Sequence, residues 1–344
     1  MQLPREVIVG NGIIDKVVEV SNRLGYKKSA LIVTGITTHD TAGKTVKGYL
    51  EEEGVKVDTL IVKSAGIKDV VTVENQIKEL RPQVVLGVGG GTRIDVAKLS
   101  SAHQKTPFIS VPTTASHDGI ASPLSSLKGS EKPHSVMAQA PIAILADTGI
   151  IMQAPWRCAV SGCGDVISKF TSVKDWRLAH KERGEYYGEY AASLALMSAK
   201  LVMKNADIIM AQREKGLRIL LEALISCGVA MSIAGSSHPC SGSEHMFSHA
   251  LDMIEPNHAM HGEQCGVGAI MMAYLHKLDW RKIKETLERL NAPTDAKDLG
   301  VREENIVKAL EISPTVRPER YTILNKLELS HEDYNNLVKM TNII

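Results

Sequence analysis

Aromatic side chains are scarce in this sequence. Phe, Trp and Tyr together make up 4% of its 344 residues, whereas methionine occurs 13 times. A hydrophobic core must therefore be filled mainly by aliphatic side chains and by the flexible thioether of methionine. Apolar residues still account for 44% of the chain, which is enough to bury a substantial core. The length is generous for one domain and comfortable for two.

A surplus of either charge is also missing. The formal net charge is +1, charged residues make up 23% of the chain, and no basic block stands out. A protein whose main partner is nucleic acid carries a basic patch or stripe. We therefore predict that nucleic acid is not a partner of this protein.

Cysteine pairs and long apolar runs are missing as well. The five cysteines form no CxxC motif and their number is odd, which indicates reduced thiols in a cytosolic compartment. The N-terminal sequence MQLPREVIVG lacks the apolar core of a signal peptide. No run approaches the roughly 18–20 apolar residues that span a bilayer. The sequence thus predicts a cytoplasmic protein without membrane insertion.

The first 150 residues alternate between strand-like and helix-like segments. Short apolar runs predict strands at residues 7–9, 30–33, 55–61, 84–86, 108–111 and 142–146. Amphipathic segments at 13–24, 41–53 and 71–80 predict helices between them. This alternation predicts an α/β domain over residues 1–150, with a mostly parallel sheet covered on both faces. Ligands of such sheets bind at the carboxyl ends of the strands.

Long helical patterns replace the short strands after about residue 150. They cover residues 165–179, 187–210, 215–231, 244–253, 266–274, 281–290, 303–310 and 331–339. We expect a domain boundary between Asp147 and Pro155, and an all-helical second domain over residues 151–344. A cleft between an α/β half and a helical half would be a natural place for an active site.

The segment VVLGVGGGTRIDVAK, residues 84–98, joins a strand to a helix through a glycine-rich turn at Gly89, Gly90 and Gly91. Glycine removes the Cβ atoms that keep an anion away from the backbone, and a helix start offers unpaired N–H groups. The segment therefore predicts a phosphate site for a nucleotide or dinucleotide, and hence an enzyme. The alternative explanation is a tight turn without a ligand.

More polar residues follow the next strand, in the loop PTTASHDG, and should lie on the same rim of the sheet. Thr113 and Thr114 carry hydroxyls that can donate to a phosphate or to a cofactor carboxamide, and Asp118 follows them. The alternative is a Ser/Thr-rich turn before a helix. On the helix after the glycines, Asp95 and Lys98 form either a surface pair or a site where Asp95 reaches a ribose or substrate hydroxyl.

Three motifs in the second half carry side chains that commonly bind metals. In SGCGDVISK, Asp165 stands among small residues at what reads as a helix start. In SGSEHMFSHALD, His245 and His249 are four residues apart and would share one helix face. In HAMHGEQCGVGA, residues 258–269, His261 precedes a helix of small residues.

Each of these motifs also has an ordinary structural explanation. The aspartate would stabilise a helix by about 1 kcal/mol as an N-cap. The two histidines of SGSEHMFSHALD could be half-buried polar residues, and His261 could be a capping or loop residue. Taken together, one carboxylate and two or three imidazoles suit zinc or a similar divalent ion, and three protein ligands leave an open position for catalysis.

The motifs occur in one order along nearly the whole chain. They are GGGTRIDVAK, PTTASHDG with the following ASPLSS, ADT at Asp147, GCGD at Asp165, EHMFSH and HGE. In this ordered set the chain resembles the superfamily of iron-containing alcohol dehydrogenases, glycerol dehydrogenases and dehydroquinate synthases, and within it the archaeal sn-glycerol-1-phosphate dehydrogenases. The resemblance implies a dehydroquinate synthase-like fold, with a Rossmann-like N-terminal domain and a helical C-terminal domain that binds metal and substrate.

The resemblance also implies roles for individual residues. A metal would be held by Asp165, His245 and His261, with one Zn²⁺ per subunit. Asp118 and His249 would be the catalytic candidates, and together with Asp165 they would contact the substrate. The implied contacts to NAD(P)H are Gly89, Gly90, Gly91, Asp95, Thr113, Thr114 and Ser122.

The implied reaction is the NAD(P)H-dependent reduction of dihydroxyacetone phosphate to sn-glycerol 1-phosphate, the backbone of archaeal ether lipids. Zinc would polarise the C2 carbonyl as a Lewis acid, and a homo-oligomer is usual in this family. The segment ITTHD, residues 36–40, leaves the cofactor preference open. Asp40 facing the adenosine ribose would favour a 2′-hydroxyl, whereas Thr37, Thr38 or His39 there would tolerate a 2′-phosphate, so we expect use of both cofactors.

Three other functions compete with this one. A glycerol dehydrogenase would have the same site and an unphosphorylated substrate. A dehydroquinate synthase is disfavoured, because its first metal ligand is typically glutamate where this chain has Asp165. A non-catalytic nucleotide-binding regulator would not need an aspartate and histidines close to a nucleotide loop.

Overall fold

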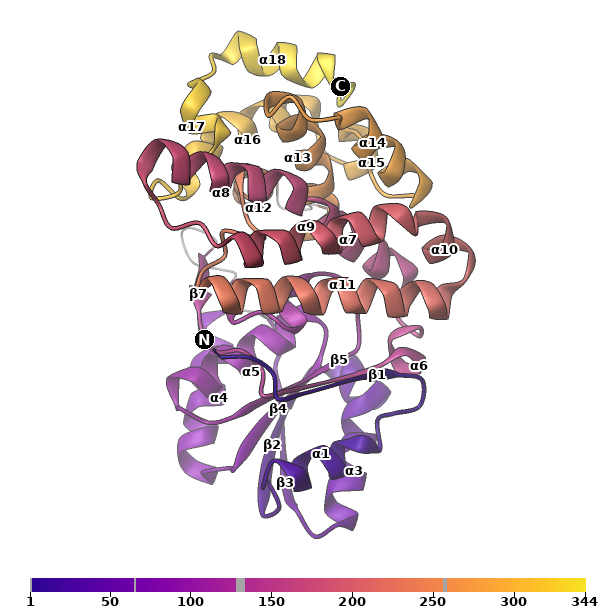
Figure 1. Ribbon diagram of the computed structural model, residues 1–344. Helices are drawn as coiled ribbons and strands as arrows, with labels where there is room; N and C mark the ends of the chain where they lie inside the picture. Colours follow the sequence, from indigo (N-terminus) through magenta and orange to yellow (C-terminus); the bar gives the residue numbers. More distant parts are fainter. Residues whose placement is uncertain (1, 65, 128–133, 256–258) are drawn as a thin grey trace. The chain divides into compact units, whose positions relative to one another are not determined.

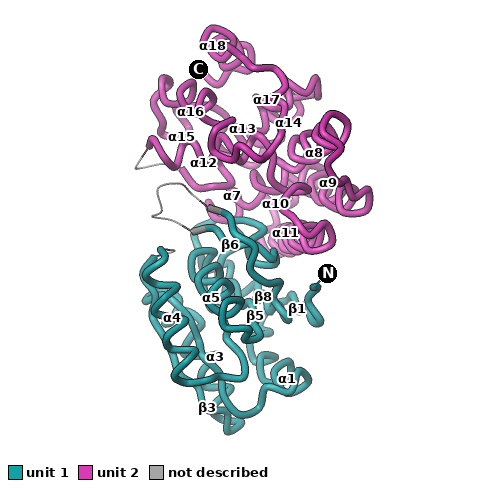
Figure 2. Tube along the Cα trace, turned by 90° about the vertical axis from the view of Figure 1, so that its left-hand side faces the viewer, with its two compact units in different colours: residues 1–156 teal, residues 157–344 magenta. Residues whose placement is uncertain are grey.

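The structure is a computed structural model that describes residues 2–64, 66–127, 134–255 and 259–344. It divides into two compact units, unit 1 (residues 1–156) and unit 2 (residues 157–344), shown in teal and magenta in Figure 2. Unit 1 is an α/β unit with a parallel sheet and unit 2 consists of helices, so the predicted fold class is confirmed. The sequence places the boundary after residue 150, six residues before the division in the structure.

A six-stranded parallel sheet forms the centre of unit 1 (Figure 1). Its strands are β1 (Glu6–Gly10), β2 (Ser29–Thr34), β3 (Lys56–Ile61), β4 (Val84–Gly89), β5 (Phe108–Pro112) and β8 (Ala143–Asp147). Their order across the sheet is β1-β8-β5-β4-β2-β3, and every neighbouring pair is parallel. All six coincide with strands predicted from the sequence. The β2 strand lies directly beside β4, which brings the end of β2 next to the glycine turn.

Both faces of this sheet are covered by helices, as the apolar character of its strands requires. Helices α1 (Lys16–Arg23) and α3 (Lys44–Glu52) pack on one face, against side chains such as Ile32 and Leu86. Helices α4 (Ile67–Leu80) and α5 (Gly91–His103) lie together on the other face (Figure 1). There Gly87 of β4 leaves room for Ala97 of α5 and for the ring of Phe108.

Shorter elements complete unit 1. They are α2 (Ile36–Thr38), the π-helical turn η1 (His39–Gly43), the 3₁₀ turn η2 (Asp118–Ile120), β6 (Leu124–Leu127), β7 (His134–Met137) and α6 (Thr148–Ile151). The β6 and β7 strands form an antiparallel pair. The PTTASHDG loop leads into the single 3₁₀ turn η2 at Asp118 and then into strand β6, so no α-helix follows it directly. Asp147 ends β8, and its carboxylate accepts hydrogen bonds from the backbone N–H groups of Gly12, Ile14 and Gly149. These bonds join the segment after β1 to the start of α6.

Unit 2 contains the remaining helices. They are α7 (Trp156–Ile167, whose first residue belongs to unit 1), α8 (Lys169–Arg183), α9 (Glu189–Lys204), α10 (Ala206–Ala211), α11 (Arg213–Ala234), α12 (Ser243–Ile254), α13 (His261–Leu275), α14 (Trp280–Arg289), α15 (Ala296–Leu299), α16 (Glu303–Val316), α17 (Ile323–Leu327) and α18 (His331–Met340). Helix α12 packs against α13 and α16, and α9 packs against α11. Two sequence-based boundaries are wrong. Asp165 lies in the last turn of α7 rather than at a helix start, and His261 is the first residue of α13 rather than a loop residue.

Helix α11 corrects one further expectation. By length and composition it is apolar enough to cross a membrane, with a mean hydropathy of 1.8 over an 18-residue window, so the statement that no such run exists is wrong. In the structure 61% of that window is buried inside the protein. Its buried side chains, such as Leu217, Leu220 and Leu224, are completely covered. This burial is typical of a helix in a protein core.

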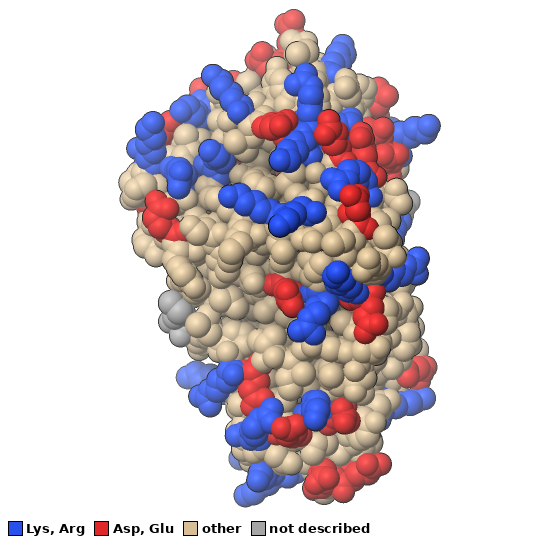
Figure 3. All heavy atoms as spheres, turned by 45° about the vertical axis from the view of Figure 1, so that its right-hand side comes forward, with Lys and Arg blue, Asp and Glu red and all other residues tan. Residues whose placement is uncertain are grey.

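Charged side chains are intermingled on the face that Figure 3 shows, where lysines and arginines lie among aspartates and glutamates. Exposed charged side chains also form pairs within one unit, such as Arg289 with Asp207 in unit 2 and Lys44 with Asp40 in unit 1. Exposed pairs of this kind contribute little to stability. The pattern agrees with the near-zero net charge.

Two glycines of unit 1 allow a test of this packing. A Cβ at Gly48, inside α3, would meet no heavy atom within 4 Å, whereas a Cβ at Gly87 would lie 2.9 Å from the Phe108 ring and 3.1 Å from the Ala97 Cβ. We expect Gly48→Ala to raise the free energy of unfolding by about 0.5–1 kcal/mol, because it lowers the entropy of the unfolded chain. Gly87→Ala should lower it by about 1–3 kcal/mol through overpacking. Thermal and urea denaturation of both variants measure the difference, and a stabilised Gly87→Ala would contradict the close approach of α5 to β4.

Candidate functional site

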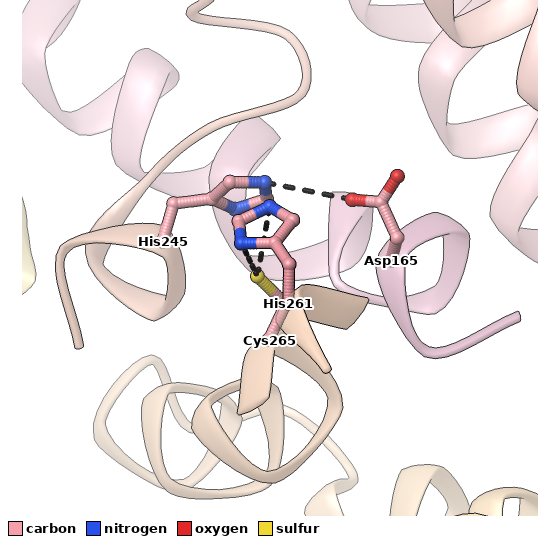
Figure 4. A group of neighbouring side chains, drawn as sticks. All are labelled: Asp165, His245, His261 and Cys265. Carbon is pink, nitrogen blue, oxygen red and sulfur yellow. Dashed lines mark hydrogen bonds and ion pairs between the residues drawn. The ribbon is translucent and has the colours of Figure 1, made fainter. Parts of the chain in front are cut away.

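Three side chains that are far apart in the sequence converge inside unit 2 (Figure 4). Asp165 comes from the end of α7, His245 from the first turn of α12 and His261 from the start of α13. Together with Cys265, one donor atom from each residue lies within 4.8 Å of the others. The His245 Nε2 is 3.5 Å from the Asp165 Oδ1, and the rings of His245 and His261 are 5.0 Å apart. The structure therefore brings together the three residues that the resemblance assigned to a metal.

Glycines let α7 and α13 approach closely enough to share this site. A Cβ at Gly262 would lie 1.9 Å from the carbonyl oxygen of Ser161, and a Cβ at Gly164 would lie 2.3 Å from the carbonyl oxygen of Gly262. No real side chain tolerates such distances, so the two backbones touch only because both positions are glycine. Each glycine is the immediate neighbour of a candidate ligand, Asp165 or His261.

Glu244 sets the orientation of the His245 ring. Its Oε1 accepts a hydrogen bond from the His245 Nδ1 at 2.8 Å, so the proton of that nitrogen points away from Asp165. The same carboxylate accepts from the Gly242 N–H and from the Thr171 hydroxyl, which fixes it in place. A carboxylate behind a histidine in this way holds the ring and raises its basicity as a metal ligand.

Ser248 sets the orientation of the His261 ring. Its hydroxyl donates to the Gln264 Oε1 at 2.6 Å and therefore accepts from the His261 Nδ1 at 3.0 Å. The amide nitrogen of Gln264 in turn donates to Asp252 and to the Ala259 carbonyl, which is consistent with this assignment of its oxygen. Both histidines are thus held with Nδ1 as the donor, and Nε2 is left for the space between the three residues.

The Asp165 carboxylate is fully buried and keeps its charge. Burial raises its pKa, but the Lys169 ammonium, together with His245 and His261, holds the pKa well below its usual range. The Lys169 Nζ donates to the Asp165 Oδ1 at 2.6 Å and to the Cys240 carbonyl at 3.1 Å, and the lysine itself is completely buried. A charged carboxylate in the interior is the form that binds a cation.

The pKa of His245 is also shifted, in the opposite direction to that of Asp165. Burial lowers its pKa, but Cys265 and the carboxylates of Asp165 and Glu244 raise the pKa well above its usual value. The His245 Nε2 lies 3.5 Å from the Asp165 Oδ1, in the space where a cation would bind. Cation binding at such a site releases protons and weakens as the pH falls.

Cys265 is a group that the sequence interpretation missed. It lies one turn after His261 on α13, and its Sγ is 3.6 Å from the His261 Nε2. Its side chain is completely buried, and burial raises the pKa of the thiol, opposed by His245. As a metal ligand the thiol would have to lose its proton to the ion. The HxxxC spacing was visible in the sequence, but only CxxC pairs were considered there.

The donor set as a whole fits a divalent cation. One buried carboxylate and two oriented imidazoles are the ligands of many catalytic zinc and iron sites. His249 follows His245 by one helical turn, is buried, and stacks on His261 with ring centres 5.9 Å apart. It lies beside the three candidate ligands, where the resemblance implies a substrate contact.

The glycine turn in unit 1 has the features expected of a phosphate site. Gly90 is the N-cap of α5, and a Cβ there would lie 3.2 Å from the Thr114 Oγ1. The Thr113 N–H donates to the Gly89 carbonyl, so the turn and the PTTASHDG loop meet as predicted. Within the part of the chain that the structure describes, the Thr113 Oγ1 is buried and has no hydrogen-bond partner, which is costly unless a ligand supplies one. His117, not singled out from the sequence, places its Nε2 1.8 Å from the Cβ position of Gly91.

Other predicted cofactor contacts are engaged within the protein. Asp95 and Lys98 form a completely buried pair rather than a surface pair, and the Lys98 Nζ also donates to the carbonyls of Gly119 and Leu124. The second oxygen of Asp95 accepts from the Ser126 N–H. Ser122 is buried and donates to the Leu124 carbonyl, and Asp118 begins the turn η2. These contacts show a structural role for Asp95 and Lys98, which join α5 to β6.

Comparison with known proteins identifies relatives over the full chain. Residues 8–155 match the family model of iron-containing alcohol dehydrogenases. The chain is 52% identical over 344 residues to the glycerol-1-phosphate dehydrogenase [NAD(P)+] of Pyrococcus furiosus, covering 100% of this chain and 99% of the relative. It is 52% identical over 324 residues to the enzyme of the same name from Methanosarcina acetivorans, covering 94% and 91%. Among solved structures, glycerol dehydrogenase from Schizosaccharomyces pombe has the same fold, with a TM-score of 0.84 at 20% identity over 99% of this chain and 90% of that one.

The orientation of His245 by Glu244 leads to a prediction. Glu244→Gln should weaken the binding of a divalent cation by about tenfold or more, because the ring loses a charged hydrogen-bond acceptor. A matched control is Glu255→Gln at the other end of α12, whose carboxylate accepts a hydrogen bond from the Asn305 side chain, away from the two histidines. Competition of each purified variant against a chelator, with metal content by mass spectrometry, measures the affinity. Equal affinities for both variants would contradict the role of Glu244.

Proposed function

Because the chain belongs to the glycerol-1-phosphate dehydrogenases, within the iron-containing alcohol dehydrogenase family, we propose that it reduces dihydroxyacetone phosphate to sn-glycerol 1-phosphate with NADH or NADPH. The observation that carries this proposal is full-length identity of about one half to enzymes of that name. The convergence of Asp165, His245 and His261 supplies a donor set suited to the reaction. Glycerol dehydrogenases share only the fold, at 20% identity.

The metal site is proposed to consist of Asp165, His245 and His261, with Zn²⁺ as the resident ion. A divalent cation there supplies Lewis acidity toward the substrate carbonyl oxygen. The protein keeps Asp165 charged through Lys169 and directs both imidazoles through Glu244 and Ser248. This preorganisation means that the ligands need not rearrange when charge develops in the reaction.

The cofactor is proposed to bind at the glycine turn of unit 1. NAD(P)H supplies the hydride. Gly89, Gly90 and Gly91 carry no side chain, so the pyrophosphate is proposed to approach their backbone N–H groups at the start of α5. The side chains of Arg93, Thr114 and His117 lie beside these glycines and could contact it as well. Thr113 and Thr114 offer hydroxyls there. We retain Asp95 and Ser122 as predicted contacts, although both side chains also bond within unit 1.

Asp118 and His249 are proposed to contact the substrate and to move the proton that the alkoxide requires. Asp118 lies in unit 1 and His249 in unit 2, beside His261. A carboxylate and an imidazole are both suited to proton transfer near neutral pH. We propose further that the enzyme acts in the cytoplasm as a homo-oligomer and supplies the glycerol phosphate backbone of ether lipids.

The substrate distinguishes the proposal from its rival. With NADH or NADPH, the purified enzyme should reduce dihydroxyacetone phosphate, and chiral analysis should identify sn-glycerol 1-phosphate as the product. In the oxidative direction glycerol 1-phosphate should be at least about a hundredfold better than glycerol by kcat/KM, because a site built for a charged group rejects a substrate that lacks it. Preference for glycerol would establish the glycerol dehydrogenase alternative instead.

Removing one proposed metal-binding side chain distinguishes the role of the metal from that of the cofactor. His261→Ala, or chelation of the wild type, should abolish turnover, while binding of NADH followed by fluorescence should change little, because the proposed cofactor residues lie in the other unit. Cys265→Ala is the matched control, since its neutral thiol is adjacent to the same rings but is not a proposed ligand. It should keep its metal. Full activity of His261→Ala would remove this residue from the site, and loss of metal from Cys265→Ala would make the thiol a ligand.

A further inference from the structure

Glu263, the acidic residue of the HGE motif, lies in the first turn of α13 and has no role in the site described so far. Its side chain is buried, with 2% exposed, and it follows the candidate ligand His261 by two residues. A buried carboxylate is costly unless charges or hydrogen bonds compensate it. The contacts of Glu263 therefore indicate what this acid does at the start of the helix.

Arg157, in the first turn of α7, compensates this carboxylate. Its Nε donates to the Glu263 Oε1 at 2.6 Å, and its Nη2 donates to the Glu263 Oε2 at 2.7 Å. Two parallel hydrogen bonds of this kind fix the direction of the carboxylate as well as its distance. The Arg157 side chain is 60% exposed, so the pair joins a surface group on one helix to a buried group on another.

Glu263 also closes the start of α13. Its Oε2 accepts a hydrogen bond from the backbone N–H of Met260, the N-cap residue, whose own side chain has no oxygen that could cap the helix. The first turn of a helix has N–H groups without helical partners and depends on such contacts. His261 is the first residue of this turn, so its position depends on whether the turn stays formed.

The pair of Arg157 with Glu263 is a second place where α7 holds α13. The first is the glycine contact, where Gly164 and Gly262 let the two backbones meet beside candidate ligands. Arg157 precedes Gly164 by seven residues, which is about 10 Å along an α-helix. Contact at one place would leave α13 free to turn about it, whereas two places so far apart on α7 restrict that motion.

We propose that Arg157 is a positioning residue for the proposed metal site. Through Glu263 it holds the first turn of α13, and so keeps His261 within reach of an ion bound by the other two candidate ligands. The proposal rests on the proposed function, which places a divalent cation at these three residues. Neither Arg157 nor Glu263 belongs to the donor group of the site. Loss of the pair therefore weakens the ion by letting its ligands separate, while each ligand keeps its own orienting partner.

Substitution of the arginine tests this role, because its side chain is exposed and its removal leaves no cavity in the core. Arg157→Ala should weaken the binding of Zn²⁺ to the intact protein by about 3- to 10-fold, less than the loss of a direct partner of a ligand, because the arginine acts through a further residue. Glu263→Gln should weaken it by a similar factor, since the neutral amide loses the charged pair. Competition against a chelator measures the affinity without turnover.

An added guanidinium distinguishes positioning from general destabilisation. Methylguanidinium should restore part of the Zn²⁺ affinity of Arg157→Ala, because the exposed position lets the free cation reach Glu263 and donate to both oxygens. Methylammonium at the same concentration should restore less, since it has the charge without the planar fork. For the same reason the affinity of Arg157→Lys should lie between those of Arg157→Ala and the wild type.

Arg289→Ala is the matched control. Arg289 donates to both carboxylate oxygens of Asp207, at 2.9 and 2.6 Å, and joins α14 to α10 in the same unit, where neither helix carries a candidate ligand. Its loss should leave the Zn²⁺ affinity unchanged, whatever thermal denaturation shows for stability. The proposal is overturned if Arg157→Ala binds Zn²⁺ no more weakly than Arg289→Ala, or if neither methylguanidinium nor a lysine at position 157 reduces its loss of affinity.

These outcomes are separate from those of the proposed function. The affinity measurement requires neither nucleotide nor turnover, so a protein that is inactive on dihydroxyacetone phosphate could still bind Zn²⁺ in a way that depends on Arg157. Conversely, an active enzyme whose affinity for the ion is independent of Arg157 would keep its function and lose only this assignment.

Discussion

The contact between the backbones of α7 and α13 is the constraint on which the site in unit 2 depends. Helices normally pack with side chains between their axes, 8–10 Å apart. Here Gly164 and Gly262 remove the side chains at the crossing, and Asp165 and His261, their neighbours in sequence, arrive in the same small space. The third candidate ligand, His245, comes from α12, which packs on α13. The convergence of the candidate ligands is thus a consequence of close packing at two glycines.

Hydrogen bonds then fix the orientation of these side chains. Each histidine donates its Nδ1 proton to a fixed acceptor, Glu244 for one ring and Ser248 for the other, and each acceptor is itself anchored. The buried Lys169 keeps Asp165 ionised. A buried charge of this kind is costly, and is tolerated where geometry and further hydrogen bonds compensate it. A buried lysine also joins α5 to β6 in unit 1, where Lys98 bonds Asp95 and two carbonyls.

The sequence predicted the parts of the molecule that are encoded locally. All six strands of the sheet, the glycine turn and the three candidate ligands could be found from periodicity, from glycine spacing and from an ordered set of motifs. Asp165 was misplaced at a helix start because only Ser168 separates α7 from α8. The burial of Lys98 and the partners Glu244, Ser248 and Gln264 depend on contacts between distant segments, which no local pattern reveals.

All the donor groups of the candidate metal site, and all the partners that orient them, belong to residues after 157. An ion coordinated by these groups would therefore be held by unit 2 alone. Exchange of nucleotide on the other unit, or any hinge motion that accompanies it, need not disturb the coordination sphere. The coordination of such an ion would then depend on the folding of unit 2 alone.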